Sequence, residues 1–216
     1  MSTVATNAHS APTVVELSPE DFRNHIDEAL AVYVTAMGYP RGTEFHRAPM
    51  WTEHMRRPGW RCVGAFSGDP TPELVGIAYG YSGDRHQWWY QQVFNGLDAR
   101  GWDPSHINGV LGDYFELTEL HVRPDAQGQG IGQSLLHLLL TNRPERGVLL
   151  STPEVAEEGN RAWRLYRRAG FQDVLRHFRF AGDARPFAVL GRALPFAHSY
   201  PAPGEPTPDM PAPTTR

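Results

Sequence analysis

The 216-residue sequence has a single cysteine, no long hydrophobic run and no excess of positive charge. The lone Cys62 excludes an internal disulfide framework and fits a reducing compartment. The formal net charge of -4 argues against a general binder of nucleic acid or acidic membranes, because both need a basic surface. Residues 1–10 lack the blocks of a signal peptide, and no apolar run reaches membrane-spanning length. The sequence therefore predicts a cytoplasmic protein with no membrane or nucleic-acid partner.

Two common catalytic arrangements are also missing. No G-x-S-x-G elbow surrounds Ser134, which argues against a serine hydrolase of the α/β type. Neither an H-E-x-x-H motif nor a paired set of His and Cys occurs among the ten histidines, so we expect no metal. Cys62 has no organised histidine partner and is interpreted as a small core residue rather than a nucleophile.

The length predicts one domain between two tails. Residues 1–11 are small and polar, and residues 197–216 are rich in Pro, Ala and Thr, so we expect both segments to be disordered. The domain then spans residues 12–196. Hydrophobic spacing within it predicts a mixed α/β order of elements. Strands are expected at residues 13–17, 60–67, 73–81, 115–122, 148–152, 178–180 and 187–190. Helices are expected at residues 19–37, within 41–58, and at 87–97, 131–140 and 160–169.

Residues 82–114 form an unusually long connection between two predicted strands. Trp88 and Trp89 lead its aromatic content, which argues against disorder. One interpretation is a lid that lines an acceptor pocket, with both tryptophans in contact with the substrate. The other interpretation, equally weighted, is a small satellite core packed on the sheet.

Residues 115–140 read as a strand, a turn and a helix. The apolar strand ends at Val122, Pro124 interrupts it, and leucines recur at helical spacing from Ile131 onward. The turn between them consists of Gln127, Gly128, Gln129, Gly130, Ile131 and Gly132. A glycine-rich turn at a helix N-terminus leaves backbone N–H groups unpaired beside the positive end of the helix dipole. Without Cβ atoms in the way, an anion such as a pyrophosphate can approach this backbone.

Three phosphate-binding loops are compared with this turn. A P-loop needs Lys followed by Ser or Thr, but Gln133 and Ser134 follow Gly132. A dinucleotide fingerprint needs G-x-G-x-x-G, whereas the spacing here is G-x-G-x-G. The remaining pattern, Q-x-x-G-x-G from Gln127 to Gly132 directly after a strand, resembles the acyl-CoA signature of the GNAT superfamily of N-acetyltransferases. The alternative is a tight turn without a ligand.

A second motif strengthens the resemblance. The pattern A-x-x-x-Y-x-x-x-G-F is present as Ala162, Tyr166, Gly170 and Phe171, about 30 residues after the turn. The resemblance implies a GNAT fold, in which helices flank a mixed central sheet that is splayed open at the acyl-CoA site. It also implies acetyl-CoA as cosubstrate. Members often form dimers, so a homodimer is a further partner to test.

The resemblance also assigns cofactor-binding residues. Backbone groups of the strand at Leu120, His121 and Val122 would meet the pantetheine arm, and the amides from Gln127 to Gly132 would hold the pyrophosphate. Asn160 resembles a pantetheine-contacting Asn, but it precedes Tyr166 by six residues rather than the commoner seven. The arginines of the helix expected at residues 160–169 have two interpretations. They either bind the 3′-phosphate of CoA or form a solvated face: Arg161, Arg164, Arg167 and Arg168.

Acetyl transfer to an amine needs a base, because an alkylamine with a pKa of ~10.4 is mostly protonated near neutrality. It also needs an acid, because the departing CoA thiolate must gain a proton. Glu116, which aligns with the base of histone-acetylating relatives, and Glu119 are both candidates, and His121 is a third. On an ideal strand the two acids point to opposite faces, so only one would face the site, unless a bulge intervenes. Tyr166, which matches the family's Tyr, is expected to contact the cofactor and to protonate the leaving thiolate. A structural role remains the alternative for each of these residues.

We therefore expect an N-acetyltransferase that moves an acetyl group from acetyl-CoA to a primary amine by direct transfer in a ternary complex. The acceptor is expected to be a small-molecule amine or a peptide amine, bound in part by Glu119. The alternative is a non-catalytic module of GNAT-like fold that binds acyl-CoA as a ligand or regulator.

Overall fold

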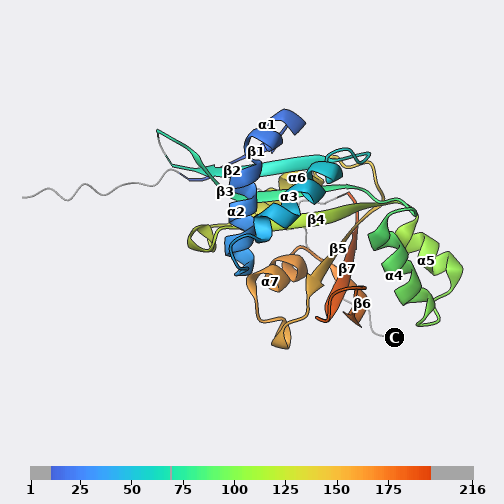
Figure 1. Ribbon diagram of the computed structural model, residues 1–216. Coiled ribbons are helices and arrows are strands. Elements are labelled where there is room, and N and C mark those ends of the chain that lie inside the picture. The colour runs from blue at the N-terminus through green and yellow to red at the C-terminus, as the bar shows by residue number, and fades with distance from the viewer. Residues whose placement is uncertain (1–10, 69, 196–216) are drawn as a thin grey trace, which may run out of the picture.

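A computed structural model describes residues 11–68 and 70–195. The predictions for the tails fall outside these residues, apart from Ala11. Seven strands form one sheet in the order β1-β2-β3-β4-β5-β7-β6 (Figure 1). The strands are β1 (Thr13–Leu17), β2 (Arg61–Ser67), β3 (Glu73–Ser82), β4 (Tyr114–Val122), β5 (Gly147–Pro153), β6 (Gln172–Phe178) and β7 (Phe187–Ala193).

The helices lie between the strands in the mixed order that the sequence predicts. They are α1 (Pro19–Asn24), α2 (Ile26–Met37), α3 (Thr43–His54), α4 (Trp88–Asp98), α5 (Pro104–Leu111), α6 (Ile131–Leu140) and α7 (Arg161–Arg168). Two short 3-10 helices, η1 (Pro124–Ala126) and η2 (Ala156–Glu158), precede α6 and α7.

Two predicted elements differ from the structure. The single helix expected over residues 19–37 is broken at His25, whose φ of -110° and ψ of 12° are not helical. The break redirects the chain, so that Phe22 of α1 and Leu30 of α2 are both buried. The closing strand expected at residues 178–180 instead spans Gln172–Phe178. Polar residues on the outer side of this edge strand hide its alternation in the sequence.

The sheet opens beside its central strand. β4 pairs with β3 along most of its length, but it pairs with β5 only from Tyr114 to Glu116, opposite Gly147 to Leu149. This is the one parallel pair among the described strands, and beyond it the two strands diverge. The expected splay is therefore present, between an arm that ends in β4 and an arm that begins with β5.

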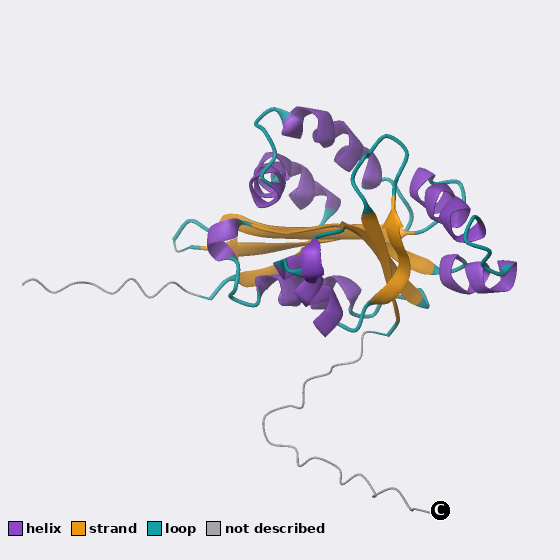
Figure 2. Cartoon of the chain, turned by 90° about the horizontal axis from the view of Figure 1, so that it is seen from below, coloured by secondary structure: helices purple, strands orange, loops and turns teal. Residues whose placement is uncertain are grey.

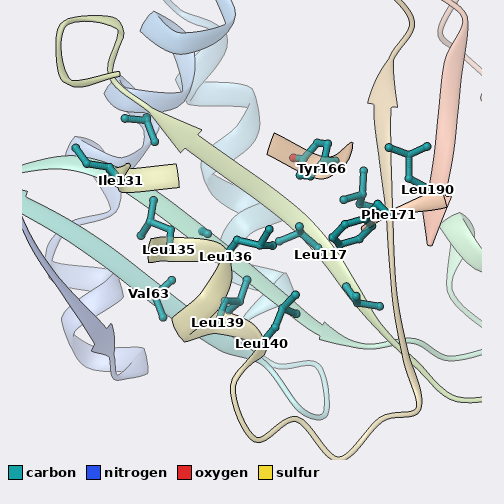
Figure 3. Close-up of a cluster of buried hydrophobic side chains, with 14 of the residues drawn as sticks. Val63, Leu117, Ile131, Leu135, Leu136, Leu139, Leu140, Tyr166, Phe171 and Leu190 are labelled. Carbon is teal, nitrogen blue, oxygen red and sulfur yellow. The ribbon is translucent and has the colours of Figure 1, made fainter. Parts of the chain in front are cut away.

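Helices cover both faces of the sheet (Figure 2). We call one side the α2 face, where α1, α2 and α3 pack on β1 to β3 around Phe22, Trp51 and Tyr79. On the opposite side, the α6 face, α6 and α7 pack against a cluster that includes Leu117 and Leu190 (Figure 3).

The 82–114 segment folds as α4 and α5 and closes a third cluster. Trp89 of α4 and Ile107 of α5 pack there against Leu149 and Val189 of the second arm. Leu149 lies opposite Glu116 in the β4–β5 register, so these two side chains share the α2 face. The α4–α5 segment therefore covers the α2 face over β5, β7 and β6, beside rather than above α1 to α3.

Candidate active site

A β-bulge in β4 sets the direction of both candidate bases. Tyr79 lies opposite Glu119 and Tyr81 opposite Glu116, so β4 has one residue more than β3 between these two pairs. The register shift falls between Tyr79 and Gly80, and Thr118 is the residue of β4 left without a partner. The extra residue cancels the odd spacing of the two acids. Both carboxylates therefore lie on the α2 face, and the ideal-strand expectation that they point to opposite faces is wrong.

Glu116 is the more buried of the two acids, with a relative exposure of 4%. The Tyr81 hydroxyl donates a hydrogen bond of 3.0 Å to its Oε1. Its Oε2 has no hydrogen-bond partner among the described residues. Burial raises the pKa of the Glu116 carboxyl to about 7, although the Tyr81 hydrogen bond and the Arg57 charge oppose the shift. A large fraction of Glu116 is therefore protonated near neutral pH.

Glu119 lies nearer the surface and is held by two side chains. The Trp51 indole N–H donates to its Oε1 over 3.2 Å. Its Oε2 lies 2.5 Å from Nε2 of His121, and each side chain of this pair is 11% exposed. The His121 ring contacts the Tyr33 ring edge-on, with centroids 5.0 Å apart. The carboxylate is thus oriented by α2 and α3 and keeps access to solvent.

Tyr166 approaches the same region from α7. Its ring packs in the cluster of the α6 face, 5.6 Å from the Phe171 ring (Figure 3). Burial raises the pKa of its phenol, and the charge of Glu119 raises it further. Tyr166 and Glu119 belong to opposite sides of the sheet, Tyr166 to the α6 face and Glu119 to the α2 face. The phenol stays protonated over the physiological range, as a proton donor must.

The free edge of β4 faces the splay. The amide of Arg123 donates to the Val75 carbonyl over 2.8 Å, so by strand alternation His121 also directs its backbone toward β3. Leu120 and Val122 then direct their backbone groups toward the gap. Gln127 already occupies one of these groups, because its Nε2 donates to the Val122 carbonyl over 2.8 Å. The groups left for a pantetheine arm are the N–H and C=O of Leu120 and the N–H of Val122.

The turn before α6 has the geometry of an anion cradle. Gly128 and Gly130 have φ values of 87° and 81°, which favour glycine. α6 begins directly after Gly130, and no side chain caps it. Within the described residues, the amides from Gly128 to Gln133 donate no hydrogen bond. Ile131 turns its side chain into the core, with 3% exposure. The free N–H groups and the helix dipole fit a pyrophosphate.

α7 brings two further side chains to this turn. Asn160 caps α7, because its Oδ1 accepts from the Trp163 amide over 2.9 Å. This contact leaves only its amide nitrogen for a ligand. Arg161 extends toward the glycine turn, where its Nη1 lies 3.6 Å from the position a Cβ on Gly128 would take. Arg167 is instead paired with Glu158. Arg161 is thus the arginine of α7 best placed for a phosphate.

The two tryptophans of α4 have different environments. Trp89 is buried, contacts the Tyr114 ring at 5.8 Å, and donates to the Ser151 hydroxyl over 3.3 Å. Trp88 is 55% exposed and packs beside Phe180. Trp89 therefore serves the satellite core, and only Trp88 has a surface that an acceptor can reach.

Sequence reasoning missed the residues of α3 that support the acids. Trp51 binds Glu119, and His54 lies 3.0 Å through Nδ1 from the Tyr79 hydroxyl. Burial lowers the pKa of His54 to about 4, so this imidazole is neutral. The only sequence signal for them was the W-x-x-H spacing, which places both side chains on one helix face.

Within the part of the chain that the structure describes, no helix has both the length and the apolar character needed to cross a membrane. Residues 11–68 and 70–195 also contain no group of three or more His, Cys, Asp or Glu side chains that could hold a metal ion.

The comparisons agree with this geometry. The family model described as an acetyltransferase (GNAT) domain matches residues 96–173. A GCN5-like protein acetyltransferase of Mycobacterium tuberculosis is 49% identical over 201 residues, covering 84% of this chain and 98% of the relative. The chain therefore belongs to the GNAT family of N-acetyltransferases, which transfer acetyl groups from acyl-CoA.

Two solved structures share the fold. The ribosomal-protein-S18-alanine N-acetyltransferase of Escherichia coli aligns with a TM-score of 0.55 at 13% identity, over 88% of this chain and 99% of that one. The phosphinothricin acetyltransferase of Sinorhizobium meliloti, in complex with AcCoA, aligns with a TM-score of 0.53 at 18% identity, over 90% and 95%. The expected GNAT fold, a splayed mixed sheet flanked by helices, is confirmed.

Proposed function

We propose that this enzyme transfers the acetyl group of acetyl-CoA directly to a primary amine of a protein or peptide, in a ternary complex. The observation that carries the proposal is the free edge of β4 at the splay, with Glu119 on the α2 face and Tyr166 packed on the α6 face. The name of the 49% identical relative, a protein acetyltransferase, favours a protein amine over a free small amine. A small-molecule amine remains the second candidate, because the Glu119 carboxylate alone does not distinguish the amine of a protein from that of a small molecule.

Bound acetyl-CoA would supply an activated thioester. The N–H groups from Gly128 to Gly132 and the Arg161 guanidinium would hold its phosphates, and the edge of β4 at Leu120 would hold its amides. These groups fit because the turn amides donate no hydrogen bond within the described residues, and β4 has no β5 partner beyond Glu116.

The chain's own residues then manage the protons. Glu119, oriented by Trp51 and His121, accepts the proton that the substrate ammonium must lose before the neutral amine attacks the thioester. The Val122 N–H, directed into the gap, donates to the oxygen on which negative charge develops. The Tyr166 phenol donates a proton to the departing sulfur, since a thiolate needs one near neutral pH. Glu116 is assigned a supporting role rather than that of the base, because it is buried and already bonded to Tyr81.

The proposal is tested by incubating the enzyme with acetyl-CoA and a lysine-containing peptide and measuring the CoA thiol that is released. The chain itself has no lysine, since all 20 of its Lys+Arg residues are arginine, so its own side chains add no acetyl-lysine background. We expect Glu119→Gln and Tyr166→Phe each to lower kcat about 100-fold or more. The affinity for acetyl-CoA, measured by calorimetry, should stay within about 2-fold, because Glu119 is not assigned to the cofactor and Tyr166→Phe keeps the aromatic ring.

Arg56→Ala is a matched control, since this exposed residue of the segment after α3 forms an ion pair with Glu53 at the surface. Normal turnover by Tyr166→Phe would show that another group protonates the thiolate. Tight acetyl-CoA binding without transfer to any peptide or alkylamine would instead support the non-catalytic binding module.

A further inference from the structure

The segment between β5 and α7 contains two residues in a strained backbone conformation. Glu157 and Glu158, here called the strained pair, have φ values of 52° and 53°, in the left-handed region that favours glycine. Such positions persist only where the surroundings fix the chain, and they gather at ligand-binding sites and switches. Gly159, Asn160 and Arg161 follow directly, and Arg161 reaches the glycine turn before α6. The contacts that hold the strained pair therefore also set the start of α7.

Glu158 is held by arginines from two other elements. Arg167 of α7 donates to both of its carboxylate oxygens, with Nε to Oε2 at 2.8 Å and Nη2 to Oε1 at 2.6 Å. Arg176 of β6 adds a third contact, from Nη1 to Oε1 at 3.1 Å. The hydrogen bonds from Arg167 hold the pKa of the Glu158 carboxyl below its usual range, so the group is charged near neutral pH. A bidentate contact fixes the position of a carboxylate as well as stabilising its charge.

The two arginines are themselves fixed by other side chains. Glu154, which directly follows β5, accepts from Arg176 through both oxygens, with Nε to Oε1 and Nη2 to Oε2 at 2.8 Å each. Asp173 bridges the two guanidiniums, 2.6 Å from Nη2 of Arg167 and 3.1 Å from Nη1 of Arg176. Both guanidinium carbons also lie over the Trp163 ring, at 5.0 Å and 4.9 Å from its centre. We call these charged residues the arginine network: Glu154, Glu158, Arg167, Asp173 and Arg176.

Trp163 connects the arginine network to the diverging end of β5. Its side chain is fully buried, and its indole N–H donates to the Pro153 carbonyl over 3.0 Å. Its amide N–H donates to Oδ1 of Asn160 over 2.9 Å, which caps the helix. The first turn of α7 is therefore fixed to the second arm of the sheet through Trp163 and the network. The later part of the helix is held by packing, because Tyr166 lies in the cluster of the α6 face (Figure 3).

We propose that Glu158 is a positioning residue for the phosphates of acyl-CoA. Its contacts with Arg167 and Arg176 keep the strained pair in place, and the strained pair in turn keeps Arg161 beside the glycine turn where the phosphates bind. Glu158 acts through Arg161 and does not touch the cofactor, since its carboxylate oxygens bind the two arginines. This role rests on the binding of acetyl-CoA in the proposed function.

The expected change in affinity has the opposite sign to a simple charge effect. A negative charge near a phosphate site repels an anionic ligand, so removal of the charge alone would strengthen the binding of acetyl-CoA. Glu158→Gln also removes the charged bidentate contact with Arg167, so we expect weaker binding. Glu157→Gln is the matched control, because the adjacent Glu157 is exposed and forms no ion pair within the described residues. The control should leave the affinity unchanged or raise it slightly.

Calorimetry with acetyl-CoA and the full chain measures the effect. We expect Glu158→Gln to raise the Kd about 10-fold, the size of one lost contact to a charged group. In an Arg161→Ala background the same substitution should raise the Kd by about 2-fold or less, because the residue that Glu158 positions is already gone. Acetyl-pantetheine has the thioester but no phosphates, so kcat/KM with this donor should agree between wild type and Glu158→Gln within about 2-fold.

The other outcomes overturn the role of Glu158 in distinguishable ways. An unchanged or lower Kd in Glu158→Gln overturns it and leaves the proposed function intact. An equal rise in Kd with and without Arg161, or an equal loss of kcat/KM with both donors, shows that Glu158 only maintains the fold. If the wild type does not bind acetyl-CoA, the proposed function fails and the role of Glu158 fails with it. Should Glu158→Gln not fold, Arg167→Lys keeps the charge but loses the bidentate contact, and it should raise the Kd in the same direction.

Discussion

At the scale of single residues, Glu116 is a buried acid whose Oε2 has no partner among the described residues. Its pKa of about 7, raised from 4.5, means that the folded state binds its proton more tightly than the unfolded state. The stabilisation is complete below the unfolded pKa of 4.5 and is lost as pH rises through about 7. We expect a loss of about 3 kcal/mol in the free energy of unfolding from this group, since each pKa unit corresponds to 1.36 kcal/mol.

Urea unfolding of wild type and Glu116→Gln at pH 5 and pH 8 measures this effect. Glutamine cannot ionise, so the variant should gain stability relative to wild type as the pH rises. The neutral His54 is present in both proteins, and its own titration cancels in the difference. A stability difference that does not change between the two pH values would mean that Glu116 is ionised in the folded protein at pH 5.

The sequence named both acids, but it did not predict how they point. Glu116 and Glu119 were recognised because acids on a strand before a phosphate turn suit amine chemistry. Their common face depends on the bulge at Thr118, and a bulge leaves no reliable pattern in one sequence because it is a tertiary adjustment of two strands. Trp51 falls in the helix predicted within residues 41–58, but its role could not be read from the sequence because its partner lies 68 positions away.

At the scale of elements, the turn before α6 was predictable because its function requires glycine at set positions. Gly130 has a φ of 81°, so Gly130→Ala should cost about 1–2 kcal/mol of stability through backbone strain. Gly132 has no positive φ, and a Cβ there would meet Leu165 Cδ2 at an ordinary 3.4 Å. Gly132→Ala is thus the matched control, with a change near zero. Urea unfolding of the two variants compares them, and equal losses would contradict the backbone explanation.

The sequence predicted only one of the two helices in the α4–α5 segment. The helix over residues 87–97 was predicted from its aromatic spacing, and α4 confirms it. The second helix, α5, was not predicted because its short sequence mixes Pro, Gly and polar residues, although the Asp103 cap followed by Pro104 was a readable start signal. Whether the segment is a lid or a core depends on which side chains the sheet covers. That information is tertiary.

A pair of substitutions distinguishes the lid from the core. Trp89 is 8% exposed and packs in the third cluster, so Trp89→Ala should destabilise the fold by about 3–5 kcal/mol. Trp88 is 55% exposed, so Trp88→Ala should change stability by about 0.5 kcal/mol or less. Thermal unfolding reports both values. If Trp88→Ala also raises the KM for the acceptor without altering that for acetyl-CoA, the exposed ring contributes to the acceptor entrance as the sequence suggested.

At the scale of the whole molecule, the splay is a weakly joined seam. Within the described strands, β4 and β5 share only the pairs from Tyr114 to Glu116. Beyond them the two arms are connected through side-chain clusters and the hydrogen bond from Arg185 to Tyr39. A ligand that pairs with the free edge of β4 and with the turn before α6 would add contacts at that seam. It would therefore bind the folded state and have no comparable site in the unfolded chain.

Thermal unfolding with acetyl-CoA, CoA, succinyl-CoA and NADH tests this view of the seam. Ligand at ~100 times its Kd should add ~2.7 kcal/mol, which raises the midpoint by roughly 5–10 °C for a domain of this size. We expect the CoA compounds to produce this shift and NADH to produce none, because the turn lacks the spacing of a dinucleotide site. Arg161→Ala should reduce the shift, since its guanidinium lies beside Gly128. An absent shift at saturating acetyl-CoA would mean that the glycine turn closes the strand–helix connection without holding phosphate, and that the seam is stable by itself.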